Sequence, residues 1–262
     1  MATVNYKNIE IHYTSTGEGN VVVLLHGFLE NLTMWDQISP KLSKNYQVVC
    51  IDLLGHGKTG SLGYSHTMEM QAEVIANVIH ELKLTECVLI GHSMGGYVAL
   101  TFAELNPRFI KGLCLMNSTA LPDTNEKKIN RDRGIAAVKY NPEIFVRMAI
   151  PNLFSEENKT IFPLEIKQST DEALKISQQG IIAAMEGMKI RKDRTKLYQT
   201  LHIPMQMIIG KQDPALDYNS LISQTKNTKV EVVEFPDGHM SHIENKIDLA
   251  NTLKRFVIGC YS

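Results

Sequence analysis

Residues 87–96, Cys-Val-Leu-Ile-Gly-His-Ser-Met-Gly-Gly, decide the fold of this chain. An apolar run typical of a buried strand leads into Gly-x-Ser-x-Gly, and the residues that follow have apolar side chains at the spacing of a helix. A chain that reverses within about two residues strains the serine and leaves no room for side chains at Gly91 and Gly95. The pattern therefore predicts a sharp strand–turn–helix that projects the Ser93 hydroxyl from the end of a sheet.

Short apolar runs alternate with helical patterns before and after this motif. Nearly continuous apolar runs are typical of strands that are buried on both faces of a parallel sheet. The runs that we interpret as strands are residues 21–25, 48–51, 88–90, 113–116, 205–209 and 230–235. Residues 4–15 alternate around Lys7-Asn8, which predicts an antiparallel hairpin at the sheet edge. The expected fold class is therefore α/β, with a doubly wound, mostly parallel sheet.

Residues 122–200 break this rhythm. They contain several helical patterns and no convincing strand, and the alternation of strands and helices resumes after them. Ser169-Thr-Asp-Glu172 has the spacing of a capping box and predicts the start of a helix that runs to about Ile190. We therefore expect a helical cap, or lid, at 122–200. It is inserted after the sixth strand into a core formed by 1–121 and 201–262.

The overall charge argues against one class of partner. The 262 residues include 27 Lys and Arg against 28 Asp and Glu, a formal net charge of −1. Nucleic-acid binding proteins normally have a basic surplus or a basic stripe, so we expect no nucleic-acid partner. We also expect no membrane span, because the apolar runs are far shorter than the ~20 residues of a spanning helix.

The N-terminus and the cysteines bear on the compartment. Residues 1–8 lack the basic start and the apolar core of a secretory signal peptide. The cysteines lie too far apart for the usual patterns of a disulfide framework or a zinc site. They are Cys50, Cys87, Cys114 and Cys260. These features favour a reducing environment, and we expect a cytoplasmic protein.

A nucleophilic serine needs a base and an orienting acid within reach. In this architecture both are expected on loops that follow later strands, with the acid first in the chain. Asp213 follows the strand at 205–209, and His239 follows the strand at 230–235. We therefore predict a catalytic triad of Ser93, Asp213 and His239, in which the carboxylate orients the imidazole.

Other residues compete for these two roles. Asp217 and Asp123 are alternative acids, and Asp213 itself also suits a loop cap or an Asx-turn. His242 is the alternative base, but it lies beside the start of the last helix, where a polar helix-end role is expected. His239 directly follows a glycine at the turn after a strand, which favours it.

The remaining histidines are assigned structural roles. His92 flanks the serine and helps to shape the pocket, and its side chain is expected to point away from the direction of the hydroxyl. His26 is expected to brace the loop that contains it. Four more are interpreted as surface or turn residues: His12, His66, His80 and His202.

Two backbone N–H groups are predicted to stabilise negative charge beside the serine. Met94 opens the helix, so its N–H has no partner within the helix and points toward the site along the helix dipole. Gly27 permits close backbone approach in the loop after an early strand. The N–H of Phe28 is therefore expected to be the second donor of an oxyanion hole.

Together these motifs resemble the α/β-hydrolase fold superfamily, in its lidded group of small serine esterases and lactonases. They occur in the family's order, as His-Gly-Phe at 26–28, Asp-Leu-Leu-Gly-His-Gly at 52–57, Gly-His-Ser-Met-Gly at 91–95, Gly-Lys-Gln-Asp at 210–213 and Gly-His at 238–239. Residues 187–193 are similar to the Gly-Met-x-x-Arg-x-Asp stretch of many members and are expected to close the lid onto the core. The chain departs from the family at Leu54 and Thr59, where Pro and Ser are common, and both are turn positions.

The resemblance implies a carboxylesterase-like serine hydrolase. Its substrate would be a small, apolar ester, lactone or thioester, cleaved through an acyl-enzyme on Ser93, with no metal and no organic cofactor. The acyl pocket is expected to include Leu29, Met185, Met188 and Met240, although helical core packing also explains the two lid methionines. The oligomeric state is not indicated.

Two other kinds of function remain open. Carbon–carbon bond hydrolases and a lyase of the menaquinone-pathway type use the same triad in this superfamily. That lyase group usually has Gly-Tyr-Ser-Met-Gly-Gly-Arg, whereas this chain has His92 and Tyr97 in place of the Tyr and Arg. From a different class, a ligand-binding receptor is also built on the hydrolase fold.

Overall fold

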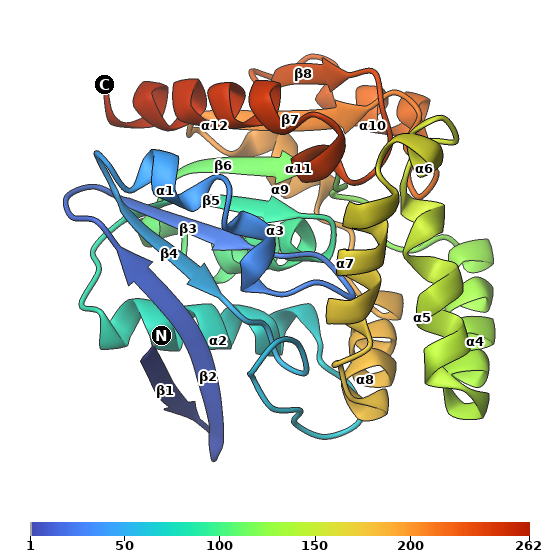
Figure 1. The fold of residues 1–262 in the computed structure, drawn as a ribbon. Coiled ribbons are helices and arrows are strands. Elements are labelled where there is room, and N and C mark those ends of the chain that lie inside the picture. The colour runs from blue at the N-terminus through green and yellow to red at the C-terminus, as the bar shows by residue number, and fades with distance from the viewer. Residues whose placement is uncertain (1) are drawn as a thin grey trace.

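The apolar runs form an eight-stranded sheet with helices on both faces (Figure 1). The structure is a computed structural model and describes residues 2–262. The strands lie in the order β1-β2-β4-β3-β5-β6-β7-β8. Their bounds are β1 (Ala2–Tyr6), β2 (Ile9–Thr16), β3 (Val21–Leu25), β4 (Gln47–Ile51), β5 (Cys87–His92), β6 (Ile110–Met116), β7 (Met205–Gly210) and β8 (Glu231–Phe235). The predicted α/β class is confirmed.

The sheet is antiparallel at its N-terminal edge and parallel elsewhere. β1 pairs with β2 and β2 with β4 in antiparallel register, whereas the pairs from β4 through β8 are parallel. The predicted hairpin turns at Lys7 and Asn8, whose φ angles of 49° and 67° are the left-handed values that a tight hairpin turn requires. The parallel strands end on the same side of the sheet, toward the helices at the right of Figure 1.

Alternate side chains of each central strand enter two separate cores. In β3, the first, third and fifth residues join a cluster with α2 (Met68–Glu81) and α3 (Met94–Leu105). The second and fourth join a cluster that contains Trp35 and α12 (Lys246–Tyr261). Figure 1 shows α2 and α12 on opposite faces of the sheet. A strand that is covered on both faces must be apolar at every position, which explains the uninterrupted runs in the sequence.

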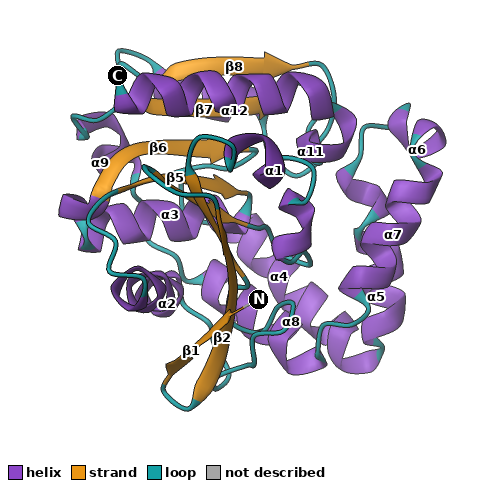
Figure 2. Ribbon diagram, turned by 60° about the vertical axis from the view of Figure 1, so that its left-hand side comes forward, coloured by secondary structure: helices purple, strands orange, loops and turns teal. Residues whose placement is uncertain are grey.

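The segment between β6 and β7 is a helical insert, so the prediction of a lid after the sixth strand is confirmed as a feature of the fold. Figure 2 shows its longer helices gathered at one end of the sheet. Its helices are α4 (Asn125–Tyr140), α5 (Pro142–Ala149), η3 (Pro151–Leu153), α6 (Asn158–Ile161), α7 (Pro163–Ala173), α8 (Gln178–Lys189) and α9 (Thr195–Thr200). Its apolar cluster includes Leu29 and Met240. The insert therefore packs on the loops after β3 and β8.

The remaining helices are short elements around the core. They are η1 (Leu32–Trp35), α1 (Ser39–Leu42), η2 (Pro107–Phe109), α10 (Tyr218–Thr225) and α11 (Ser241–Glu244). Within residues 2–262, the structure contains no helix with the length and apolar character needed to cross a membrane.

One predicted helix start is wrong. Residues 169–172 lie inside α7, which begins at Pro163, because a proline at the first helical position already has a helical φ and needs no N–H partner. The next helix, α8, follows Ser177, whose hydroxyl accepts a hydrogen bond from the Gly180 N–H at 3.0 Å. The capping residue between these helices is therefore Ser177.

A buried ion pair joins the two ends of the insert. Asp123 accepts a hydrogen bond from Arg191 Nη1 at 2.5 Å and also pairs with Arg131. Arg191 Nε donates to Leu121 O at 3.0 Å, and its guanidinium lies 4.1 Å from the ring centroid of Tyr97 in α3. Burial alone would raise the pKa of Asp123, but the two arginines outweigh burial and hold that pKa below its ordinary value. These contacts fix the insert to the core.

We expect Ser177→Ala to lower the free energy of unfolding by about 1 kcal/mol, because α8 loses its N-cap. Ser169→Ala is the matched control in the interior of α7 and should change the free energy by less than about 0.5 kcal/mol. Urea unfolding of both variants measures the difference. Equal losses in the two variants would contradict the assignment of the cap to Ser177.

We expect Arg191→Met to lower the free energy of unfolding by about 3 kcal/mol at pH 7, because Asp123 stays buried with one arginine fewer. The folded state lowers the pKa of Asp123, so the pair stabilises above the unfolded pKa of about 3.9, and this contribution is lost as the pH falls through the folded value. The difference from wild type should therefore shrink below about pH 4. Urea unfolding at pH 7 and below about pH 4 measures the difference between Arg191→Met and wild type, with the exposed Lys192→Met as control. A difference that does not depend on pH would argue against the ion pair.

Candidate active site

Ser93 makes the sharp turn between β5 and α3 by itself. Its backbone has φ of 49° and ψ of −114°. A Cβ at Gly91 would lie 2.3 Å from the carbonyl oxygen of Gly95, and a Cβ at Gly95 would lie 2.5 Å from that of Leu25. Distances this short exclude a side chain at either position, which is why the motif needs both glycines.

The structure brings Ser93, His239 and Asp213 into one hydrogen-bonded series. His239 Nε2 lies 2.9 Å from Ser93 Oγ, and His239 Nδ1 lies 2.7 Å from Asp213 Oδ2. The histidine is 3% exposed, and its backbone N–H donates to Leu153 O of the insert at 2.9 Å. The three side chains thus have the mutual geometry that a nucleophile, a base and an orienting acid require.

Asp213 is held as a carboxylate by several donors. Its Oδ1 accepts the N–H groups of Ala215 at 2.8 Å and Leu216 at 3.1 Å, and its Oδ2 accepts Asn117 Nδ2 at 3.1 Å. Burial alone would raise the pKa of Asp213, but His239 and these hydrogen bonds outweigh burial and lower that pKa. The Asx-turn role considered from the sequence is therefore present alongside the contact with His239.

Asn117 belongs to the site, although the sequence analysis did not single it out. It directly follows β6, has φ of 44°, and donates from Nδ2 to both Asp213 Oδ2 and Gly238 O at 3.1 Å. Its Oδ1 accepts the hydroxyl of Ser241 at 2.7 Å. The signal available in the sequence was its position at the carboxyl end of a buried strand.

The two competing acids are engaged elsewhere, and the competing histidine faces another group. Asp217 caps α10 by accepting the Ser220 N–H at 2.7 Å, and Asp123 pairs with arginines at the ends of the insert. His242, on α11, directs its Nε2 toward Glu30 at 3.6 Å. Of the two candidate bases, His239 is therefore the one that pairs with Ser93.

The two predicted oxyanion donors lie beside the nucleophile. Within residues 2–262, neither the N–H of Phe28 nor that of Met94 has a hydrogen-bond acceptor. The loop before Phe28 approaches closely, since a Cβ at Gly27 would lie 3.2 Å from Ser93 Cβ. Leu29 has φ of 64°, a left-handed value that strains a leucine. The loop therefore adopts a costly conformation next to the serine.

Glu30 is the second site residue that the sequence analysis missed. Its Oε2 accepts the Gly27 N–H at 2.7 Å and lies 2.7 Å from His92 Nδ1, while His92 Nε2 lies 3.0 Å from His239 O. Burial alone would lower the pKa of His92, but the charge and the hydrogen bond of Glu30 outweigh burial and raise that pKa. Glu30 and His92 are 62 positions apart, so no local pattern pairs them.

The other histidines divide between expected and unexpected positions. His26 braces its loop as predicted, with Nδ1 2.7 Å from Gly27 O and Nε2 accepting the Leu53 N–H at 3.0 Å. The surface assignment of His66 is wrong. Its side chain is fully buried, and its N–H donates to Ala183 O of the insert at 2.8 Å.

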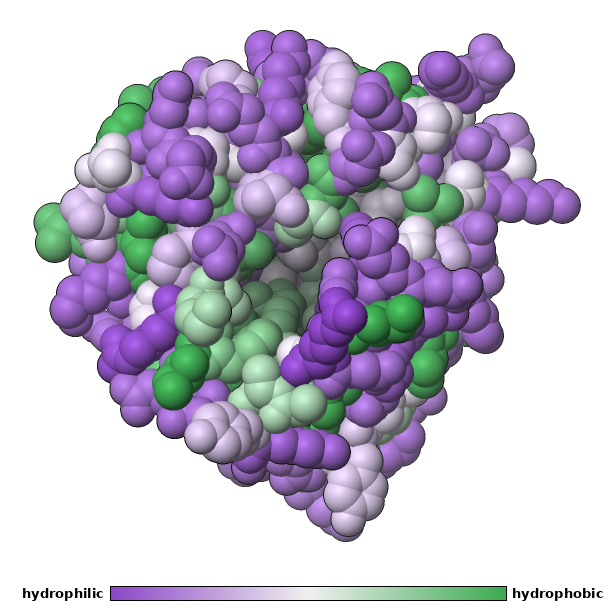
Figure 3. Space-filling view, turned by 90° about the vertical axis from the view of Figure 1, so that its right-hand side faces the viewer, coloured by the Kyte–Doolittle hydropathy of each residue, from purple (hydrophilic) through white to green (hydrophobic). Residues whose placement is uncertain are grey.

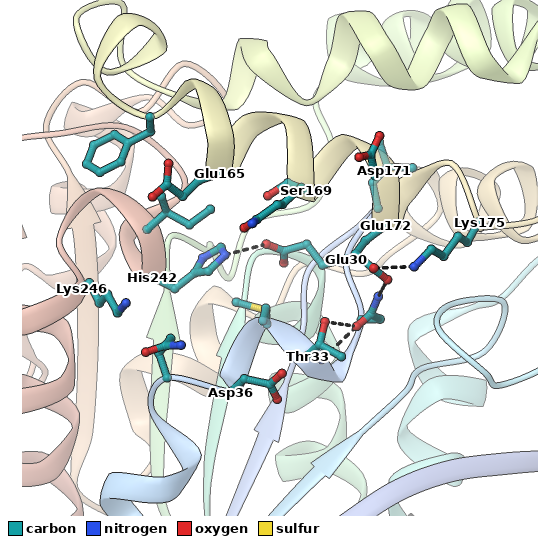
Figure 4. A pocket seen from close by; sticks show the side chains of 17 residues that line it. Glu30, Thr33, Asp36, Glu165, Ser169, Asp171, Glu172, Lys175, His242 and Lys246 are labelled. Atoms are coloured by element: carbon teal, nitrogen blue, oxygen red, sulfur yellow. Dashed lines mark hydrogen bonds and ion pairs between the residues drawn. The ribbon is translucent and has the colours of Figure 1, made fainter.

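A cleft of about 730 Å³ opens between α7 and the segment at 29–37. Figure 3 shows that the face bearing the insert is hollowed near its centre. Glu30 and His242 line the cleft and point toward each other (Figure 4). Ser93 and His239 are not among the residues that line it.

The four residues predicted to line the acyl pocket are all buried. Leu29, Met185 and Met240 join the apolar cluster of the insert, whereas Met188 joins the core under the sheet with α2 and α3. Only Leu29 also lines the cleft of Figure 4. Core packing, the alternative considered for the two lid methionines, therefore describes both Met185 and Met188.

The chain is similar to known hydrolases in sequence and in fold. A family model described as alpha/beta hydrolase fold matches residues 20–156. A malate-bound thermophilic esterase from Thermogutta terrifontis is 28% identical, with a TM-score of 0.90 over 99% of this chain and 97% of that chain. The 2-hydroxy-6-oxo-6-(2'-aminophenyl)hexa-2,4-dienoic acid hydrolase of Metapseudomonas resinovorans is 25% identical over 272 residues, covering 97% of this chain and 89% of that protein.

Another relative is matched over a shorter region. An uncharacterized protein of Mycobacterium tuberculosis is 27% identical over 135 residues, so the match spans 52% of this chain but only 38% of that protein. The family match itself extends over more than half of the 262 residues. It includes β3 through β6, the turn at Ser93 and the loop that contains Phe28. The chain therefore belongs to the alpha/beta hydrolase fold family.

Proposed function

We propose that this protein is a serine hydrolase that cleaves a carboxylic ester, a lactone or a thioester of a small, apolar molecule. The observation that carries the proposal is the series of hydrogen bonds from Ser93 Oγ through His239 to Asp213, at 2.9 Å and 2.7 Å. The similarity to the Thermogutta terrifontis esterase over 99% of the chain supports the ester class.

The proposed reaction has two acyl-transfer steps. His239 Nε2 accepts the Ser93 proton as Oγ attacks the carbonyl carbon, and the same proton then goes to the leaving alcohol or thiol. In the second step His239 takes a proton from water, hydroxide attacks the acyl-enzyme, and Ser93 recovers its proton as the acid leaves. Asp213 keeps the proton of the neutral imidazole on Nδ1 and stabilises the imidazolium between transfers.

The N–H groups of Phe28 and Met94 are the proposed oxyanion donors. Each tetrahedral intermediate carries its negative charge on the former carbonyl oxygen, and one such donor typically contributes ~10²–10³ in rate. The acyl group is assigned to the apolar cluster that contains Leu29, Met185 and Met240, which adjoins the loop of Phe28. Apolar side chains around the acyl group would favour hydrocarbon acyl chains over charged ones.

A carbon–carbon bond hydrolase is the second candidate. The observation that favours it is the similarity to the dienoic acid hydrolase of Metapseudomonas resinovorans over 97% of this chain. The same serine, base and acid would serve that chemistry, with a carbanion in place of the alkoxide as leaving group. The two candidates differ in whether simple activated esters are turned over efficiently.

We expect the wild type to hydrolyse p-nitrophenyl esters and Ser93→Ala to lose the activity by at least about 10⁴-fold, because the nucleophile is removed. A series from acetate to long acyl chains, followed as p-nitrophenolate release, measures the activity and sizes the pocket. Ser223→Ala, which changes an exposed serine, is the control and should retain full activity. No turnover of any chain length would contradict the general esterase and favour the carbon–carbon hydrolase, or a receptor that turns its ligand over slowly.

We expect Asp213→Asn to reduce kcat by about 10⁴-fold, because an amide at this position favours the wrong tautomer of His239. Asp217→Asn is the matched control, since asparagine is as good an N-cap as aspartate and α10 should be unaffected. Steady-state kinetics on the best ester of the series measures both. Equal activity of the two variants would exclude Asp213 as the orienting acid.

A further inference from the structure

Three buried side chains beside the catalytic histidine form a cluster that the proposed reaction does not use. They are Glu30, His92 and His242, and one potential ligand atom from each lies within 4.8 Å of the others. All three side chains are more than nine-tenths buried. They come from the loop after β3, the end of β5 and α11, so the sheet brings together residues that are far apart in the sequence.

The geometry at His92 requires a cation between two acceptors. His92 Nε2 lies 3.0 Å from His239 O, which only accepts, so the ring must carry a proton on Nε2. In a neutral ring this leaves a lone pair on Nδ1, directed at Glu30 Oε2 across 2.7 Å. A separation of 2.7 Å fits an N–H···O hydrogen bond from a protonated ring. A metal ion bound to both atoms would take the place of that proton, with the two ligand atoms moving apart.

A third ligand atom faces the same point. His242 Nε2 lies 3.6 Å from Glu30 Oε1, too far for a hydrogen bond. Within residues 2–262, Glu30 Oε1 and His242 Nδ1 are buried without any hydrogen-bond partner. Unsatisfied polar atoms at such depth are costly, and a bound ion satisfies the carboxylate oxygen.

We propose that Glu30, His92 and His242 form a binding site for one divalent transition-metal ion of the zinc class. Two imidazoles and one carboxylate are a common protein ligand set for Zn²⁺. Ligand atoms about 2.0–2.1 Å from a tetrahedral ion are roughly 3.3 Å apart. Glu30 Oε2 lies 2.7 Å from His92 Nδ1, and Glu30 Oε1 lies 3.6 Å from His242 Nε2. These two separations lie on either side of that value.

The surroundings of the cluster suit a metal site. The N–H of His92 Nε2 donates to a backbone carbonyl and Glu30 Oε2 accepts a backbone N–H, which are the outer contacts that orient metal ligands. The cleft of Figure 4 gives solvent access to Glu30 and His242 and leaves room for a fourth ligand. Carboxylates outnumber lysines along it, namely Glu30, Asp36, Glu165, Asp171 and Glu172 against Lys175 and Lys246.

The ion would act on the positions of catalytic groups rather than on the substrate. Glu30 holds the N–H of Gly27, next to the proposed oxyanion donor Phe28, and His92 holds the carbonyl of His239. A metal ion that joins Glu30 to His92 would therefore fix the oxyanion loop and the loop of the base relative to each other. The site is distinct from Ser93, so metal binding is measured without reference to the esterase activity.

The test uses untagged protein that has been freed of metal by a chelator and then dialysed. We expect isothermal titration with Zn²⁺ to give one ion per chain and the thermal midpoint to rise with Zn²⁺ concentration. Co²⁺ should bind at the same stoichiometry and produce the visible absorption of a four-coordinate ion. Glu30→Gln and His242→Asn should each weaken binding at least ~10-fold, because each removes a ligand.

His202→Asn is the matched control, since it removes an exposed histidine and should leave the titration unchanged. Circular dichroism and urea unfolding check that the Glu30→Gln and His242→Asn variants are folded. Failure of the wild type to bind Zn²⁺ would overturn the proposal, and so would binding as strong as that of the wild type in both Glu30→Gln and His242→Asn. The cation between Glu30 and His92 would then be a proton. Loss of ester hydrolysis in Ser93→Ala with metal binding intact would separate this site from the proposed activity.

Discussion

The left-handed backbone of Ser93 is the constraint on which the rest of the site depends. A non-glycine residue held in such a conformation costs about 1–3 kcal/mol, and it persists only where its surroundings fix it. The Ser93 N–H donates to Met116 O at 2.9 Å, and the Ser93 carbonyl accepts the Ser118 hydroxyl at 2.8 Å. Both partners belong to the end of β6 and the loop after it. The strain at the nucleophile is therefore supported by the neighbouring strand.

The same loop extends this support to Asp213 and to the loop of His239. The Asn117 N–H donates to Ile208 O of β7 at 2.9 Å, while its side-chain amide reaches Asp213 and Gly238 and its amide oxygen accepts from Ser241. One amide thus joins the carboxyl ends of β6, β7 and β8. Because it is buried and its side-chain donor and acceptor are both satisfied, it fixes the spacing of these loops as well as stabilising them.

The parts of the fold that the sequence predicts from the residues alone are those that depend on local chemistry, whereas the three residues of the predicted triad come from the order of the motifs along the chain. Uninterrupted apolar runs mark the central strands because both faces of the sheet are covered, and the turn at Ser93 needs glycines at fixed positions. The capping box at 169–172 fails because a proline six residues earlier already starts the helix, and four residues alone do not reveal that context. The sequence does not reveal the buried positions of Glu30 and His66, because their partners, His92 and the insert, lie far along the chain.

In the proposed reaction, the position of the insert couples substrate selection to the chemistry. Leu29 follows the proposed oxyanion donor Phe28 and Met240 follows His239, and both side chains enter the apolar cluster of the insert. In addition, the backbone N–H of His239 donates a hydrogen bond to the carbonyl oxygen of Leu153 in the insert. A change of packing in the insert should therefore move the loop of Phe28 and the loop of His239 together. If the proposed reaction is right, substitutions there should alter kcat as well as KM, since the side chains proposed to contact the acyl group pack next to the loops of Phe28 and His239.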